Sequence, residues 1–149
     1  HTRYPLVTGV QTCALPIYNA AIGAAVSFIG FVREVAKVHQ SEQLTSLYLE
    51  HYPDMTEKSL LEIENKARGK WHLEDVFIVH RVGELKLHDP IVGVIVLSAH
   101  RKDAFDACAF IMDYLKTEAP FWKKEITKEN ARWVEAQESD DEMRLRWNI

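Results

Sequence analysis

Two segments with helical spacing of their apolar residues, set among runs of β-branched and aromatic residues, constrain this fold most strongly. The first begins at Pro53, where Asp54 and Glu57 have the spacing of a capping box, and its expected end is Gly69. Spacings of three and four define one apolar face on this helix. That face consists of Leu60, Ile63, Ala67 and Trp71.

The second helical segment starts near Asp103 and Asp106, whose negative charges suit the positive end of a helix dipole. Pro120 ends it, because proline cannot continue a helix. Its predicted buried face consists of Phe105, Cys108, Met112 and Leu115.

The β-rich runs predict a sheet around these helices. Polar connections are expected at 34–42 and 83–90, and the acidic stretch 137–142 is expected to be a solvated tail. Strands and helices alternate only in part, so we predict an α+β fold with a mainly antiparallel sheet in a single domain. The predicted strands are 24–33, 44–52, 76–82, 91–99, and a hairpin of 121–127 with 132–135 around residues 128–131.

Residues 1–18 (HTRYPLVTGVQTCALPIY) show no useful periodicity, and Pro5, Gly9 and Pro16 break up the apolar centre that a signal peptide needs. Residues 7–17 (VTGVQTCALPI) instead resemble the translation of a sequencing-library adapter. We therefore predict that residues 1–18 are non-native and that the domain spans 19–149. A natural, poorly ordered N-terminus is the alternative, and Cys13 is given no role on either interpretation.

Composition and charge exclude several classes of protein. The 149 residues carry a net charge of −4, which argues against binding to nucleic acid or anionic membranes. The two cysteines form no disulfide framework, and no apolar run approaches the ~20 residues of a membrane span. We expect a soluble, cytoplasmic protein. No phosphate-binding, nucleophile-elbow or metal-binding motif is present, so we expect no metal.

Cations stand beside aromatic residues, glycines or element ends at four places, where functional sites are usually assembled. If the four places converge, they form an anion pocket suited to phosphate. Each has a structural alternative: Lys116 suits the end of a helix, Lys123 and Lys124 suit an edge strand, and Cys108 suits a core. The cations are Arg33, His100, Arg101, Lys116, Lys123 and Lys124.

Several longer motifs occur together and in order: LEHYPDMTEK (49–58), HRVGEL (80–85), SAHR (98–101), FIMDYLKTEAPFWKKE (110–125) and RWVEA (132–136). In this combination, residues 23–147 resemble the large, catalytic subunit of molybdopterin synthase. The family usually has a further strand and helix before Gly23, where this chain has the adapter-like segment. Some relatives carry a basic residue at the position of Gln137, so Gln137 is given no role.

The resemblance implies an α/β-hammerhead fold with an added antiparallel sheet. It implies a sulfurtransferase that converts cyclic pyranopterin monophosphate to molybdopterin without a cofactor. Sulfur comes from the C-terminal Gly-Gly thiocarboxylate of a small ubiquitin-like partner subunit, and two large subunits form the centre of a heterotetramer.

The resemblance also assigns site residues one by one. Lys116 is implied to be catalytic as an acid/base or as a transient covalent amine, and Lys123 to be catalytic by anchoring the incoming tail or stabilising negative charge. The test of these roles is whether the cations share one cleft, with or without residues of a second protomer. The implied substrate-binding residues are Phe31, Val32, Arg33, His100, Arg101, Lys116, Lys123, Lys124 and Glu125.

Two other functions remain open from the residues alone. A non-enzymatic anion or RNA binder would use the same cations, although the net charge of −4 opposes it. A protein-interaction module would bind a partner without converting a pterin.

Overall fold

In a computed structural model, the described part of the chain comprises residues 6–7, 19–33, 44–119, 121–127, 131–134 and 138–148. The expected loop at 34–42 lies outside these residues, as does most of the expected turn at 128–131. No helix in the described ranges is both long and apolar enough to cross a membrane. The elements are β1 (Leu6–Val7), β2 (Ala24–Phe31), β3 (Leu44–His51), α1 (Pro53–Lys70), β4 (Asp75–Arg81), β5 (Gly83–Lys86), β6 (Pro90–Ser98), α2 (Arg101–Glu118), β7 (Phe121–Thr127), β8 (Ala131–Val134) and α3 (Glu138–Leu145).

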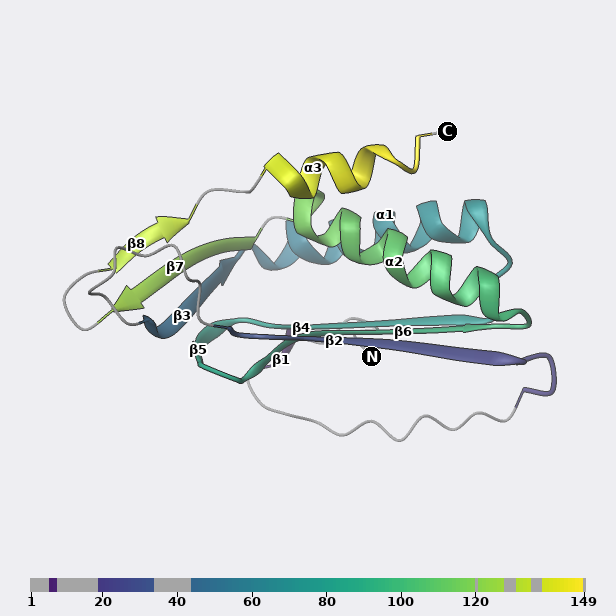
Figure 1. The fold of residues 1–149 in the computed structure, drawn as a ribbon, viewed down its shortest axis with the longest axis horizontal. Helices are drawn as coiled ribbons and strands as arrows, with labels where there is room; N and C mark the ends of the chain where they lie inside the picture. The colour runs from purple at the N-terminus through teal and green to yellow at the C-terminus, as the bar shows by residue number, and fades with distance from the viewer. Residues whose placement is uncertain are drawn as a thin grey trace.

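The strands of the described residues form two four-stranded sheets. Sheet A has the order β1-β4-β6-β2, and sheet B has the order β5-β3-β7-β8. The pairs are antiparallel except for β1 with β4, which are parallel. Figure 1 shows sheet B extending from one end of sheet A. The predicted α+β fold with mainly antiparallel strands is confirmed. β1 lies within residues 1–18, whose non-native origin stays a prediction.

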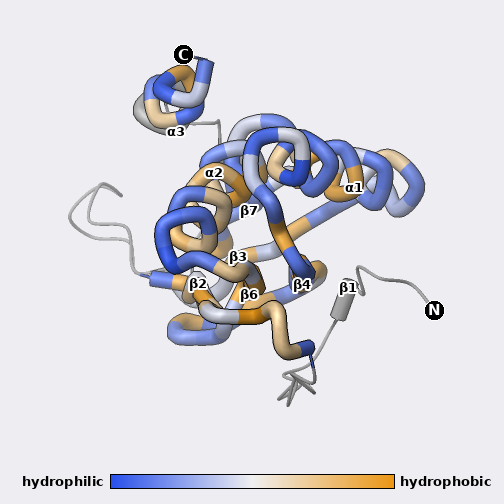
Figure 2. The backbone as a smooth tube through the Cα atoms, turned by 90° about the vertical axis from the view of Figure 1, so that its right-hand side faces the viewer, coloured by the Kyte–Doolittle hydropathy of each residue, from blue (hydrophilic) through white to orange (hydrophobic). Residues whose placement is uncertain are grey.

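The main core lies between sheet A and the two long helices. Figure 1 shows α1 and α2 over one face of sheet A. Figure 2 shows hydrophobic residues concentrated in β6 and alternating with hydrophilic ones along α1 and α2. This pattern follows from burying one stripe of each helix against a sheet. The predicted α1 residues Leu60, Ile63 and Ala67 are fully buried, and Trp71 packs against the cluster from the helix end.

The buried face of α2 differs from the predicted one. Cys108 and Leu115 are buried as expected, but the Phe105 side chain is 62% exposed. The buried stripe is displaced by about one residue position, or about 100°. The predicted face was chosen from the large apolar side chains. In the structure, the small Ala104 and Ala107 face the core, which lets the helix approach the sheet closely. The stripe consists of Ala104, Ala107, Cys108, Phe110, Ile111, Tyr114 and Leu115.

The ends of α1 also correct the sequence prediction. Its N-cap is Tyr52 without a side-chain capping bond, so the capping box of Asp54 and Glu57 is wrong. The backbone N–H of Thr56 donates to the Tyr52 carbonyl at 2.8 Å, and the fixed φ of a proline at the first turn suits helix initiation. The helix passes through Gly69 and ends one residue later.

The predicted connection at 83–90 contains a strand. Only one residue separates the end of β4 from the start of β5, and β5 pairs with β3 in sheet B. The chain therefore crosses from sheet A to sheet B at this point. Gly83 makes the crossing with a φ of +85°, in the left-handed region that disfavours residues with a Cβ.

Gly83→Ala is expected to lower the free energy of unfolding by about 1–2 kcal/mol, the usual cost of left-handed backbone for an L-residue. A Cβ at Gly83 would meet nothing within 4 Å, so the cost comes from the backbone alone. Urea denaturation measures it. Gly69→Ala is the matched control, because Gly69 is helical and equally open, and it should stabilise the protein by about 0.5–1 kcal/mol. Equal effects from both would contradict the role of the turn.

The structure places a helix, α3, over most of the stretch 137–142 that the sequence predicted to be a solvated tail, and the contacts with α2 are made by residues that follow this stretch. Arg144 of α3 forms an ion pair with Glu118 of α2 at 3.2 Å. The Trp147 indole donates to Asp113 at 2.7 Å and packs edge-on against Phe110. These partners come from α2, so the local acidic composition of the tail did not reveal them.

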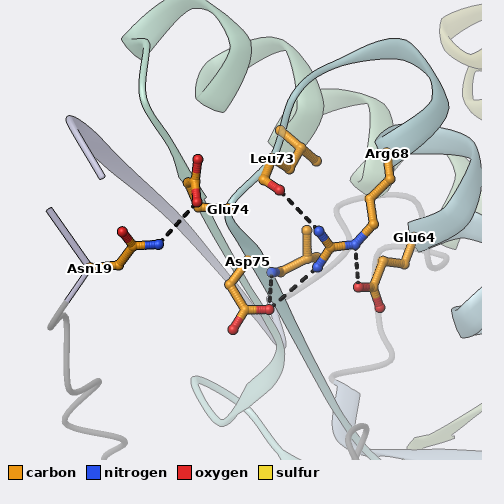
Figure 3. A network of polar contacts seen from close by, with 7 residues as sticks. Asn19, Glu64, Arg68, Leu73, Glu74 and Asp75 are labelled. Atoms are coloured by element: carbon orange, nitrogen blue, oxygen red, sulfur yellow. Dashed lines mark hydrogen bonds and ion pairs between the residues drawn. The ribbon is translucent and has the colours of Figure 1, made fainter. Parts of the chain in front are cut away.

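A polar network holds the end of α1 to the start of β4 (Figure 3). The Arg68 guanidinium donates to Glu64 at 2.8 Å and to the Leu73 carbonyl at 3.0 Å. It also donates to the Asp75 carboxylate at 3.4 Å. The same carboxylate accepts from the backbone N–H of Val76. These contacts hold the first residues of β4 against the end of α1.

Candidate active site at the junction of the two sheets

Several candidate residues lie where sheet A meets sheet B. Val92 of β6 is the register partner of both Gly30 in β2 and His80 in β4, so the last residues of β2 and β4 reach the same end of sheet A. Arg33 follows β2 at this end and is exposed. The junction therefore carries one of the predicted cations on its sheet A side.

Sheet B and α2 bring two more of the predicted cations toward this junction. Lys116 lies in the last turn of α2, where the negative end of the helix dipole favours a cation. β7 begins at Phe121, just after this helix end. Lys123 is two residues further along β7 and therefore on the same face of the strand as Phe121. Both lysine side chains are exposed.

His80 links the two sheets at this junction. Its ring stacks on Phe121 with centroids 3.7 Å apart and planes 13° apart. Its Nδ1 lies 2.8 Å from the Arg81 carbonyl oxygen. A carbonyl can only accept, so Nδ1 carries the hydrogen, and in the neutral ring Nε2 is left as an acceptor.

The electrostatics of His80 reflect its position among cations. The pKa of His80 is lowered to about 4, mainly by burial and to a smaller extent by the positive charges of Lys123 and His51, against the opposing effect of the hydrogen bond to Arg81. The imidazole is therefore neutral at neutral pH. His51 is the register partner of Phe121 across β3 and β7, so it belongs to the same junction.

Acidification is expected to destabilise the fold through His80. The folded pKa is lowered, so the unfolded chain binds the proton more readily, and stability is lost as the pH falls from about 6.5 toward 4. Between pH 7 and pH 5 the loss from this group should be about 2 kcal/mol. Urea denaturation at several pH values measures it, and His80→Phe should remove this part of the dependence. An unchanged pH profile in that variant would contradict the assignment.

His100 and Arg101 lie at the opposite end of sheet A. Ser98, the last residue of β6, pairs with Ala24 at the start of β2. His100 is the N-cap of α2, and its backbone N–H faces the Ser98 hydroxyl at 3.4 Å. Fifteen residues of helix separate Arg101 from Lys116, which is about 22 Å along the axis. A single chain therefore does not bring these two sets of cations together.

Other candidate residues make structural contacts. Glu125 is buried and accepts from the Arg132 Nε and Nη2 at 3.2 and 3.1 Å, which ties β7 to β8. Lys124 points to the other face of β7, with its Nζ 5.6 Å from the Trp133 ring centroid. Val32 is buried in a small cluster, and its backbone N–H donates to the Asp89 carbonyl at 2.9 Å. Phe31 is 55% exposed beside it.

His80 and His51 are not among the site residues predicted from the sequence. The available signal was a histidine, His80, near the end of an apolar strand. No local sequence pattern indicates that it would stack on Phe121, which lies about forty residues later. Arg81 contributes to the fold at the same place, since its Nη1 donates to the Pro90 carbonyl at 3.1 Å. Within the described part of the chain, no cluster of three or more His, Cys, Asp or Glu residues could hold a metal ion.

Comparisons with known proteins place the chain in a family. A family model described as MoaE protein matches residues 7–118. A molybdopterin synthase catalytic subunit of Ralstonia nicotianae is 49% identical over 141 residues, which cover 95% of this chain and 78% of that protein. One of Salmonella typhimurium is 56% identical over 125 residues, covering 84% and 81%.

A solved structure agrees with this placement. The crystal structure of molybdopterin synthase from Staphylococcus aureus aligns with a TM-score of 0.73 and 38% identity, covering 78% of this chain and 83% of that one. The predicted resemblance is confirmed. The chain belongs to the MoaE family of molybdopterin synthase catalytic subunits, sulfurtransferases of molybdenum cofactor biosynthesis.

Proposed function

We propose that this chain transfers sulfur from the C-terminal thiocarboxylate of a small ubiquitin-like carrier to cyclic pyranopterin monophosphate, forming the dithiolene of molybdopterin. Membership of the MoaE family over most of the chain is the observation that carries this proposal. The junction of the two sheets supports it, because Arg33, Lys116 and Lys123 lie on or just after elements that begin or end there, on a chain whose net charge is −4. Both reactants are anionic at their reacting ends.

The proposed chemistry explains why cations are needed. The sulfur of a carrier thiocarboxylate attacks a substrate carbon and an oxygen leaves. Water then cleaves the acyl–sulfur bond and releases the carrier as its carboxylate, a second carrier supplies the second sulfur in the same way, and the cyclic phosphate opens. Prepositioned cations stabilise the negative charge that develops at each step. Lys116 acts as an acid/base or as a covalent amine, and Lys123 anchors the tail or stabilises the developing charge. Arg33, His100 and Arg101 hold the phosphate and pterin end.

A complete pocket requires a second copy of the chain. His100 and Arg101 are about 22 Å along α2 from Lys116, which is further than one small substrate can bridge. In a symmetric dimer, each α2 start can face the other copy's junction, which yields two equivalent pockets. We therefore propose that Arg101 of one copy and Lys116 of the other act on the same substrate molecule.

Subunit complementation tests this arrangement. Lys116→Ala and Arg101→Ala chains, co-expressed with different tags, are purified as the mixed dimer and supplied with thiocarboxylated carrier and cyclic pyranopterin monophosphate. Each mutant homodimer should be inactive at substrate concentrations below KM. The mixed dimer has one intact pocket of two and should show about half the wild-type turnover.

Two outcomes would count against the proposal. A mixed dimer as inactive as its parents would place both groups in a pocket within one chain, and an active Arg101→Ala homodimer would place Arg101 outside the pocket. A wild-type protein that binds the carrier yet forms no product would support an interaction module instead of an enzyme.

A further inference from the structure

The contact between His80 and Phe121 joins the two sheets beside the proposed pocket. His80 lies one residue from the end of β4, where its backbone pairs with Val92 on one side and Leu6 on the other. Its ring leaves sheet A and stacks flat on the first residue of β7, with centroids 3.7 Å apart. The stack therefore fixes the start of β7 against the end of β4.

This contact is located where it controls one lysine. Phe121 and Lys123 are alternate residues of one strand, so a shift of the Phe121 ring moves the origin of the Lys123 side chain directly. Lys123 is close enough to His80 for their charges to interact. Arg33, the predicted cation on the sheet A side of the junction, follows β2, which pairs with β6, whereas Lys123 lies on β7 of sheet B.

The hydrogen bonding of His80 suits this role. Nδ1 donates to the Arg81 carbonyl, which fixes the ring plane. The titratable groups that face the ring from other elements are Lys123 of β7 and His51 of β3. A ring without charge can pack beside these groups without repelling them, which a lysine or arginine at position 80 could not do.

We propose that His80 is a positioning residue for sulfur transfer: through its stack on Phe121 it holds Lys123 in place against the cations of sheet A. The proposal rests on the proposed function. It extends the site to a residue that contacts neither reactant, and it predicts that the ring, not its capacity to take a proton, is what turnover requires.

A double-mutant cycle tests it. Turnover is measured with saturating thiocarboxylated carrier for wild type, His80→Ala, Lys123→Ala and the double variant. His80→Ala should lower kcat by about tenfold or more, since small displacements of a catalytic group have effects of this size. In the Lys123→Ala background, the same change should alter kcat by less than about twofold, because the group it positions is gone. Multiplying effects would overturn the proposal.

Conservative variants separate positioning from general stability. His80→Phe keeps the stacked ring and should retain kcat within about threefold, whereas a merely proton-dependent role would lose activity with the imidazole. Phe121→Leu removes the stack from the other side and should reproduce the His80→Ala defect. This second route keeps the test decisive if His80→Ala does not fold. A His80→Phe protein that folds yet is as slow as His80→Ala would contradict the proposal.

A readout without turnover distinguishes this proposal from the proposed function. Lysines are reductively methylated with ¹³C-formaldehyde, and the Lys123 resonance is assigned by its absence in Lys123→Ala. That resonance should shift in Phe121→Leu and stay in place in His80→Phe. If wild type makes no product, the proposed function fails, while the resonance still reports whether the stack positions Lys123. A Lys123 resonance that does not shift in Phe121→Leu would contradict the positioning role.

Discussion

Lys116→Ala is expected to abolish molybdopterin formation while leaving the fold and the carrier complex intact. The side chain is exposed in the last turn of α2, so its removal leaves no cavity. If Lys116 supplies a proton or an amine at the reacting carbon, the loss should be at least about 100-fold in kcat. Product formation from thiocarboxylated carrier measures it, with thermal unfolding and gel filtration as checks on the fold and complex.

Two further variants define what the lysine contributes. Lys70→Ala removes an exposed cation from the far end of α1 and should retain full turnover. Lys116→Arg keeps the charge but supplies no amine at neutral pH. If charge alone matters, Lys116→Arg should be partly active, and if proton transfer or covalent chemistry matters, it should be as inactive as Lys116→Ala. Near-normal turnover of Lys116→Ala would remove the catalytic assignment.

Phe110→Ala is expected to lower the free energy of unfolding by about 3–5 kcal/mol. The Phe110 side chain is 1% exposed, and it meets Trp71, Tyr114 and Trp147 with ring centroids at 5.3, 4.4 and 5.6 Å. Its removal leaves a cavity at the point where α1, α2 and the C-terminal segment pack. Urea denaturation measures the loss.

Phe105→Ala is the matched control on the same helix. Its side chain is 62% exposed, so the substitution should change stability by no more than about 0.5 kcal/mol. The comparison also tests which stripe of α2 is buried, because the sequence pattern alone predicts the reverse order. A larger loss for Phe105→Ala than for Phe110→Ala would contradict the packing of α2 on sheet A.

Local patterns predicted most of the elements and their order. The β-branched runs at 24–31 and 90–98 became strands, and Leu60, Ile63 and Ala67 became the buried face of α1, because burial on a sheet demands these spacings. Predictions failed where the partner was distant. β5 needed β3 to become a strand, and the packing of Arg144 and Trp147 needed Glu118 and Asp113 of α2.

The family motifs indicated which cations to examine, and the structure divided them between two places. Arg33, Lys116 and Lys123 lie on or just after elements that begin or end at one junction. His100 and Arg101 lie at the start of α2, at the other end of sheet A. Sequence proximity gave no indication of this division. The length of α2 decides it, since a straight helix of eighteen residues keeps its two ends apart.

The sequence by itself determined most of the strand and helix segments, the α+β class and the family, because spacing and motif order are properties of the chain. The tertiary structure alone decided which stripe of α2 is buried, that the chain crosses from β4 in sheet A to β5 in sheet B, and that His80 stacks on Phe121. These depend on contacts between residues far apart in sequence. Their free energy comes from shape and burial at a shared place, which no local pattern encodes.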